Sequence, residues 1–253
     1  MIRNDLHVHS LQSFCGFHTI LEIAEIAIAK GMRMVNISDH GAGLGRAMNF
    51  GVIVDKRRLP DPLILADGSS ILLRRGIEAN IMDINGNTDI PQKLIPKFDL
   101  ISIGFHFCGL PQYGSEADNT RALRNVLKKS PIDLLTHPCI ASYPLDIPAV
   151  VELAKEYGFA LEINNTNLRV NKTDLPKLEQ MTALALEHEV ALVETSDGHT
   201  FHEIGENEKV EEFLRRMGLD GEDVLINRDD DRLDRFIQSR IALRRDAEAL
   251  SSE

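Results

Sequence analysis

Short apolar runs that alternate with helical patterns are the feature of this sequence that most limits its fold. Seven runs rich in Val, Ile and Leu recur along the 253 residues, with helical spacing of apolar residues between most of them. This alternation predicts parallel strands joined by crossover helices. The predicted strands are Asn4–His9, Met34–Ser38, Ile71–Glu78, Leu100–Phe105, Leu134–His137, Ala160–Ile163 and Val190–Glu194, with Val224–Ile226 as a candidate eighth.

Helical patterns fill most of the gaps between these runs. Thr19 and Glu22 have the spacing of a capping box, and Gly31 stands where the helix that Thr19 begins would end. Apolar residues at helical spacing predict the later helices. These cover Asp118–Lys129, Ile147–Tyr157, Asp174–His188 and Glu206–Met217, followed by a charged C-terminal helix over Asp231–Leu250.

One segment, Gly41–Ser70, interrupts this rhythm. It carries several glycines, Pro60, Pro62 and a basic run over Lys56–Arg58, so it is predicted to form a long loop beside the functional site. No change of composition marks a linker. The chain is therefore predicted to form a single barrel-like α/β domain over residues 1–253.

The charge and the cysteines of the chain limit its partners and its compartment. The 39 acidic residues exceed the 28 basic ones, so binding of nucleic acid through a basic face is not expected. No signal-peptide pattern and no long uncharged apolar run are present, so a cytoplasmic protein with no membrane partner is expected. Cys15, Cys108 and Cys139 are an odd number of cysteines, and reduced thiols are expected.

Residues of the kinds that bind metal ions lie at or just after the ends of separate predicted strands. They are His7, His9, Asp39, His40, Glu78, His106, His137, Asp197 and His199. The carboxyl ends of the strands converge on one face of a (β/α) barrel, so these side chains are predicted to meet there. Strand alternation places His7 on the same side as His9, and it groups Asp197 with His199 if the strand continues that far.

The donor types favour more than one ion. Imidazole suits Zn, Mn and Fe, and the carboxylates of Glu78 and Asp197 can bridge ions or complete their coordination. Two or three divalent ions of this kind fit the number of donors better than one. His188, inside a predicted helix, and His202, beyond the last strand, miss the pattern and are predicted to lie at the surface.

Several short motifs follow one another along nearly the whole chain. They are DLHVHS at Asp5–Ser10, SDHG at Ser38–Gly41, GIEAN at Gly76–Asn80, GFH at Gly104–His106, THP at Thr136–Pro138, EINN at Glu162–Asn165 and SDGH at Ser196–His199. In this order they resemble the polymerase-and-histidinol-phosphatase (PHP) superfamily, and most of all its stand-alone bacterial phosphatase branch. The resemblance implies an α/β fold, a distorted (β/α)7 barrel with mainly parallel strands, that carries a trinuclear metal site and phosphoesterase activity.

The same resemblance assigns metal ligands residue by residue. They fall on His7, His9, His40, Glu78, His106, His137, Asp197 and His199, with Glu78 as the bridging carboxylate. A water molecule activated by the ions would attack the substrate, so no separate catalytic side chain is assigned.

The chain departs from that branch at one ligand position. Six residues after His9, where the branch usually carries a further histidine, the residue is Cys15, and His18 follows three residues later. Three alternatives stay open: His18 substitutes, Cys15 binds as a thiolate, or the third ion is weakened or missing. His18 is preferred because imidazole is the more general ligand for Mn, Fe or Zn.

Residues beside the ligands are expected to support them. Asp5 and Asp39 are interpreted as carboxylates that orient His7 and neighbouring ligands, because a ligating imidazole usually donates its second nitrogen to such a partner. Cys108 and Cys139 are interpreted as buried packing residues. The basic residues Arg46, Lys56, Arg57 and Arg58 could meet substrate charge, but a solvated charge run is the favoured interpretation.

The function that these features favour is hydrolysis of a small phosphate monoester by a metal-dependent phosphatase. Two alternatives stay open. Related barrels that open with a similar HxH pair act as metal-dependent amidohydrolases or deaminases, and some PHP domains fused to DNA polymerases are non-catalytic metal-binding modules. The GIEAN and THP motifs favour the phosphatase, and all but one of the expected ligand positions are filled, which argues against a non-catalytic module.

Overall fold

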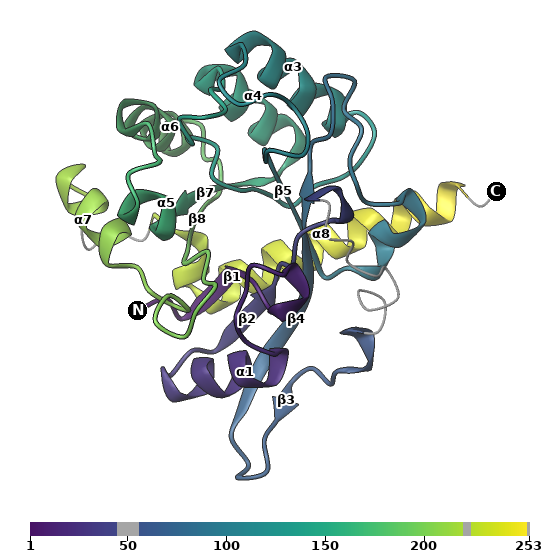
Figure 1. Cartoon of the computed structure of the whole chain (residues 1–253), viewed down its shortest axis with the longest axis vertical. Coiled ribbons are helices and arrows are strands. Elements are labelled where there is room, and N and C mark those ends of the chain that lie inside the picture. Colours follow the sequence, from purple (N-terminus) through teal and green to yellow (C-terminus); the bar gives the residue numbers. More distant parts are fainter. Residues whose placement is uncertain (45–55, 220–223, 252–253) are drawn as a thin grey trace.

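The computed structural model describes residues 1–44, 56–219 and 224–251. Within them a mostly parallel sheet of seven strands curls into a nearly closed barrel with helices packed around it (Figure 1). The strands are β1 (Asn4–Val8), β2 (Met34–Ile37), β4 (Ser70–Asn80), β5 (Leu100–Gly104), β6 (Leu134–Leu135), β7 (Ala160–Asn164) and β8 (Leu192–Thr195). Each pairs with the next in parallel. The predicted distorted α/β barrel of mainly parallel strands is confirmed.

The chain just beyond β8 brings the last strand back to the first. Val8 pairs with Gly198, and the backbone N–H of His9 donates to the carbonyl of Gly198 at 2.9 Å. In return, the N–H of Gly198 donates to the carbonyl of His7 at 3.3 Å. These bonds lie at the carboxyl end of both strands, so barrel closure and assembly of the functional site depend on the same contacts.

Helices occupy the predicted places around the barrel. They are α1 (Ile20–Ala29), α3 (Glu116–Leu127), α4 (Ile147–Tyr157), α5 (Asn165–Arg169), α6 (Leu175–Glu187), α7 (Glu208–Arg216) and α8 (Asp230–Ser251). The capping box of α1 is present: Thr19 N donates to Glu22 Oε2 at 2.7 Å, and Glu22 N donates to Thr19 Oγ1 at 3.3 Å. Of these α-helices in the described residues, α5 was not predicted, since its single turn is too brief for a helical repeat.

Two sequence predictions differ from the structure. The predicted loop Gly41–Ser70 contains a short strand, β3 (Leu63–Ile64), which pairs antiparallel with the start of β4. The candidate eighth strand at Val224–Ile226 is wrong, because Leu225 makes one isolated bridge to Leu192 before the chain turns into a short 3₁₀ helix over Ile226–Arg228. Both segments are too short to show a periodic pattern.

The C-terminal helix α8 closes the end of the barrel opposite the site. In Figure 1 it runs behind the strands, across the molecule. Its Leu233 and Ile237 pack in one cluster with residues at or near the starts of six strands. Those residues are Leu6, Met34, Leu100, Leu134, Ala160 and Val193. The apolar cluster fills the amino-terminal end of the barrel, so polar side chains gather at the carboxyl end.

A buried ion-pair cluster fastens α8 to the barrel. Asp133, just before β6, is fully buried and accepts from Arg240 Nε at 3.1 Å and from Arg244 Nη1 at 2.5 Å. The same carboxylate accepts from Ile101 N at 2.8 Å.

None of the helices in the described residues combines the length and the apolar character that a membrane-spanning helix requires.

Candidate metal centre

Glu78, near the carboxyl end of β4, lies among the side chains that the sequence predicted to meet. Ring nitrogens of five histidines lie 3.0–3.5 Å from its two carboxylate oxygens. These histidines are His7, His9, His40, His106 and His137. They come from β1 and from the chain after β2, β5 and β6, so the barrel brings together residues far apart in sequence.

Asp197 and His199 join this cluster from the chain after β8. Asp197 Oδ1 lies 3.3 Å from His9 Nε2 and 3.6 Å from His7 Nε2. The rings of His9 and His199 stack with their centroids 4.4 Å apart. The strand does not continue as expected, because β8 ends at Thr195 and Asp197 has a left-handed backbone with φ of 51°. A turn, rather than strand alternation, brings both side chains into the site.

A bulge in β1 aims His7 into the barrel. Between Asp5 and Val8 the strand advances three residues while β2 advances two, from Val35 to Ile37. The bulged carbonyl of Leu6 accepts side-chain hydrogen bonds from Asn36 Nδ2 at 2.9 Å and Ser38 Oγ at 3.0 Å instead of a ladder bond. Because of the extra residue, Leu6 packs in the apolar cluster at the amino-terminal end of the barrel, whereas His7 faces Glu78.

The electrostatics of the cluster suit a cation. Burial raises the pKa of the Glu78 and Asp197 carboxyls, but the surrounding imidazoles outweigh it and hold both pKa values well below the ordinary range. Burial, together with the nearby imidazoles of His199 and His40, lowers the pKa of His9 to about 3. Two ionised carboxylates buried beside a neutral imidazole are a donor set suited to a bound cation.

Several buried donor atoms at this end of the barrel fit bound metal ions. Glu78 Oε2 makes no hydrogen bond although three ring nitrogens lie within 3.5 Å, and one of these nitrogens, His40 Nδ1 at 3.0 Å, also has no hydrogen-bond partner. Buried polar atoms are rarely left in this state unless water or an ion satisfies them. Donor atoms gather within 4.8 Å in the groups His7–His9–Glu78 and His40–Glu78–His106.

The position where the sequence left a choice contains Cys15. The donor atoms of Cys15, His9, His40 and His199 lie within 4.8 Å of one another. Burial raises the pKa of the Cys15 thiol, but the imidazoles of His199 and His40 outweigh it and lower the pKa to about 7.

His18, the residue preferred from the sequence, lies outside every such group among the described residues. Its Nε2 instead accepts a hydrogen bond from Phe201 N at 3.0 Å. The arrangement favours Cys15 over His18 at this position, because one ring nitrogen of His18 is already engaged by the backbone and His18 is in none of the donor groups.

A carboxylate that sequence reasoning left without a role, Glu162 of β7, orients His7. Its Oε1 lies 2.6 Å from His7 Nδ1 and accepts from Thr195 Oγ1 at 2.6 Å, while its Oε2 accepts from the backbone N–H of His137. The contact fixes the proton of His7 on Nδ1 and turns Nε2 towards Glu78. The EINN motif contained this residue, but a carboxylate inside a strand gave no separate signal.

Asp5 and Asp39 support the site differently from the expectation. Asp5 accepts from the backbone N–H groups of His7, Ser196 and Gly205, so it holds the backbone rather than the ring of His7. Asp39 accepts from Ser13 Oγ at 2.8 Å, and that hydroxyl lies 3.1 Å from His9 Nδ1.

The remaining histidines and cysteines lie outside the donor groups. His202 is exposed, and His188 is half-buried at the end of α6. Cys139 is a buried packing residue, as predicted, with its sulfur 3.7 Å from Met181 Sδ. Cys108 is only half-buried.

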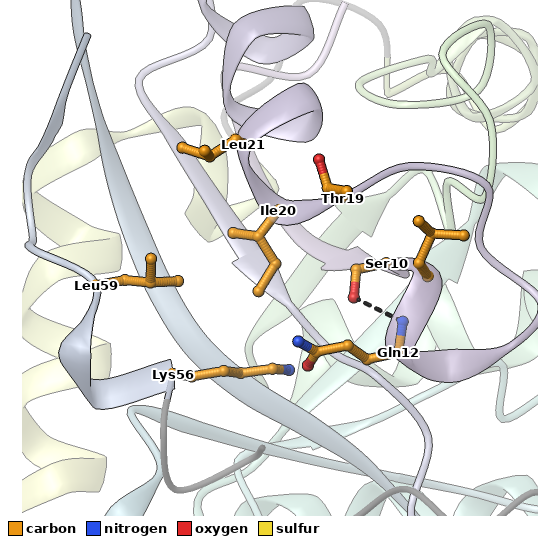
Figure 2. Close-up of a pocket in the computed structure, with 8 residues that line it drawn as sticks. Ser10, Gln12, Thr19, Ile20, Leu21, Lys56 and Leu59 are labelled. Carbon is orange, nitrogen blue, oxygen red and sulfur yellow. Dashed lines mark hydrogen bonds between the residues drawn. The ribbon is translucent and has the colours of Figure 1, made fainter.

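Lys56 is not available to a substrate. Its Nζ pairs with Asp39 Oδ2 at 2.7 Å, and the side chain is buried. Figure 2 shows its side chain between the start of α1 and Leu59, where it lines a pocket. The pocket has a volume of about 390 Å³, and none of the predicted ligands lines it. Arg58 is exposed, whereas Arg46 and the side chain of Arg57 lie outside the described residues.

The substitution Glu162→Gln is expected to weaken metal binding roughly 10- to 100-fold, the range typical for partners that orient a ligand. The carboxylate now accepts from four donors, two on each oxygen, and an amide presents an NH₂ group to two of them, so the hydrogen bonds that fix the ring of His7 are weakened. Metal retained against a graded chelator series measures the effect, with the exposed Glu187→Gln as the matched control. Equal retention by both variants would contradict this role.

The nearly closed α/β barrel of this chain, with histidines and carboxylates gathered at its carboxyl end, has the arrangement of a metal-binding α/β-barrel protein. No protein-family model matches the chain. A probable phosphatase of Caldanaerobacter subterraneus subsp. tengcongensis is 31% identical over 93% of this chain and 91% of that protein. A probable phosphatase of Aeromonas hydrophila is 32% identical over 93% and 94%, and one of a Shewanella species is 34% identical over 93% and 91%.

Solved structures share the fold. The histidinol phosphate phosphatase of Lactococcus lactis, in complex with zinc, L-histidinol and phosphate, is similar with a TM-score of 0.55 and 16% identity over 85% of this chain and 94% of that one. A chain of an archaeal ribonuclease P with mature tRNA has the same TM-score at 13% identity, covering 94% and 90%. At these identities the likeness concerns the fold alone.

The identity to these relatives extends over nearly the whole chain. The chain belongs to the PHP superfamily, in its group of probable phosphatases. Membership of that group identifies it as a phosphoric ester hydrolase, and the donor groups support a dependence on metal.

Proposed function

We propose that the protein hydrolyses a small phosphate monoester at a centre of two or three divalent ions, Zn, Mn or Fe. The observation that carries the proposal is the position of Glu78, an ionised carboxylate among five imidazoles at the carboxyl end of the barrel. The proposed ligands are His7, His9, Cys15, His40, Glu78, His106, His137, Asp197 and His199. A single cytoplasmic domain with reduced thiols and no nucleic-acid partner is part of the proposal.

Divalent ions held there supply Lewis acidity, which lowers the pKa of water and neutralises charge on a phosphate group. The chain's own residues prepare the site. Glu78 and Asp197 provide fixed negative charge, Glu162 holds the proton on His7 Nδ1, and Asp39 acts on His9 through Ser13. Each carboxylate either faces the cluster or fixes a ring that does, so the donors are preorganised before substrate binds.

A metal-dependent amidohydrolase remains the second candidate, because a barrel with clustered His and Asp donors also suits attack of water on an amide. Identity to phosphatases over most of the chain favours the phosphoric ester. A non-catalytic module is disfavoured because every predicted ligand except His18 lies in or beside the donor cluster.

The test is a hydrolysis screen on freshly purified protein, with metal analysis of the same sample. Phosphate monoesters, including histidinol phosphate as the compound suggested by the Lactococcus lactis neighbour, are compared with diesters, amides and deaminase substrates. Release of phosphate from monoesters is expected, together with loss of activity in chelator and its return with Zn, Mn or Fe. Turnover of amides alone would support the second candidate, and metal-loaded protein without any turnover would support the non-catalytic metal-binding module.

A further inference from the structure

The donors at the carboxyl end of the barrel are of two chemical kinds. The group His7–His9–Glu78 and the group His40–Glu78–His106 each contain a carboxylate. The group of His9, Cys15, His40 and His199 contains a thiol and imidazoles without a carboxylate. The softness of a donor set biases which metal binds, so these groups differ in the ion that they favour.

The shared residue His9 faces the carboxylate side of the cluster. Its Nδ1 lies 3.1 Å from Ser13 Oγ, which leaves Nε2 as the nitrogen able to bind an ion. That Nε2 lies 3.0 Å from His7 Nε2, 3.3 Å from Asp197 Oδ1 and 3.5 Å from Glu78 Oε2. One lone pair serves one ion, so His9 is assigned to the carboxylate-containing positions. His40 belongs both to the group with Glu78 and His106 and to the group with Cys15 and His199. It is assigned to the second, because Cys15 and His199 would otherwise be only two donors, and these three residues then form a position of their own.

We propose that Cys15, His40 and His199 form a thiolate–imidazole position that selects zinc over manganese, beside carboxylate-containing positions that accept either ion. The inference rests on the proposed metal centre and adds which ion occupies one part of it. Thiolate is a soft donor that favours zinc, whereas carboxylate and water suit manganese. Three protein donors with one coordination site open are also the usual arrangement of a reactive zinc ion.

The first test uses a spectroscopic property that only a metal–sulfur bond gives. Protein produced in cobalt-supplemented medium is expected to show a near-ultraviolet thiolate-to-cobalt charge-transfer band. The band should vanish in Cys15→Ser and in Cys15→His, while Cys108→Ser keeps it, since Cys108 is a half-buried cysteine outside the donor groups. A band that persists without the Cys15 sulfur would overturn the proposal.

The second test measures selectivity. Proteins are loaded from equal concentrations of zinc and manganese, washed, and analysed for both metals. Wild-type protein is expected to keep zinc at this position, Cys15→Ser to lose one equivalent of zinc, and Cys15→His to keep the ion with more manganese in place of zinc. An unchanged zinc-to-manganese ratio in Cys15→His would overturn the selectivity.

The same samples separate this inference from the proposed function. Protein that binds cobalt, hydrolyses a phosphate monoester and lacks the charge-transfer band contradicts the thiolate position while the phosphatase stands. Protein that binds neither cobalt nor zinc and hydrolyses nothing contradicts both. Wild-type folding of the variants, checked by circular dichroism, assigns any loss of metal to the donor rather than to the fold.

Discussion

Glu78→Gln is expected to reduce phosphate monoester hydrolysis by roughly a thousandfold, because an amide cannot supply the negative charge that now faces five imidazoles. A thousandfold lower rate corresponds to an activation free energy that is higher by about 4 kcal/mol, the expected cost of losing this charge. Metal content should fall as well. The barrel should stay folded, since glutamine has the same size and Thr136 Oγ1 can still donate to its oxygen as it now does to Glu78 Oε1.

Steady-state rates, metal analysis and circular dichroism of the Glu78→Gln protein check this expectation. Glu187→Gln, on the exposed end of α6, is a matched control that should retain full activity and metal. Hydrolysis by Glu78→Gln at the rate of the control would remove Glu78 from the reaction.

Asp133→Ala should lower thermal stability without touching the metal centre. The change leaves two arginines buried without their partner, Arg240 at 7% exposure and Arg244 at 2%, and removes the acceptor of Ile101 N. Breaking a buried pair by removing one partner costs about 3–5 kcal/mol. For a chain of this size that corresponds to a fall in Tm of roughly 10 °C.

Calorimetry or thermal circular dichroism measures the fall in Tm. The matched control is Glu179→Ala, which removes an ion pair with Arg216 whose side chains are about half exposed, 44% and 48%. That loss should shift Tm by no more than about 2 °C. A similar Tm for the two variants would show that α8 is held by its apolar contacts alone. If the alanine variant does not fold, the Tm of Asp133→Asn, which keeps the size of the side chain, is measured instead.

The regular part of the fold was accessible from the sequence because each element carries a repeating signal. The helix at Ile147–Tyr157 was predicted to the residue, since its apolar spacing is bounded by Asp146 as a cap and by Gly158 in a left-handed turn. The strand β3 and the turn α5 were missed because two or five residues contain no full repeat. The bulge in β1 was also missed. The run of apolar and histidine residues in β1 has the same sequence pattern whether its pairing with β2 is regular or contains an extra residue.

Residues that meet in the site were predictable wherever a strand end fixed their direction. His7, His9, Glu78, His106 and His137 were of this kind. The choice between Cys15 and His18 was not predictable, because the path of the loop before α1 decides which side chain turns inward. That path depends on contacts across the whole chain, such as the bond from Phe17 N to the carbonyl of His199.

Contacts between the two ends of the described chain have a consequence for the order in which the protein folds. Asn4 Nδ2 donates to the carbonyl of Asn227, and Asn227 Nδ2 donates to the carbonyl of Asn4, across 223 residues. Arg244 reaches Asp133 across 111 residues. On the ribosome, β1 can pair with β2 early, but its contacts with the C-terminal part of the chain form only after nearly the whole chain has been synthesised. Every proposed donor of the metal-binding face, up to His199, is synthesised before α8 (Asp230–Ser251) emerges and seals the opposite end of the barrel.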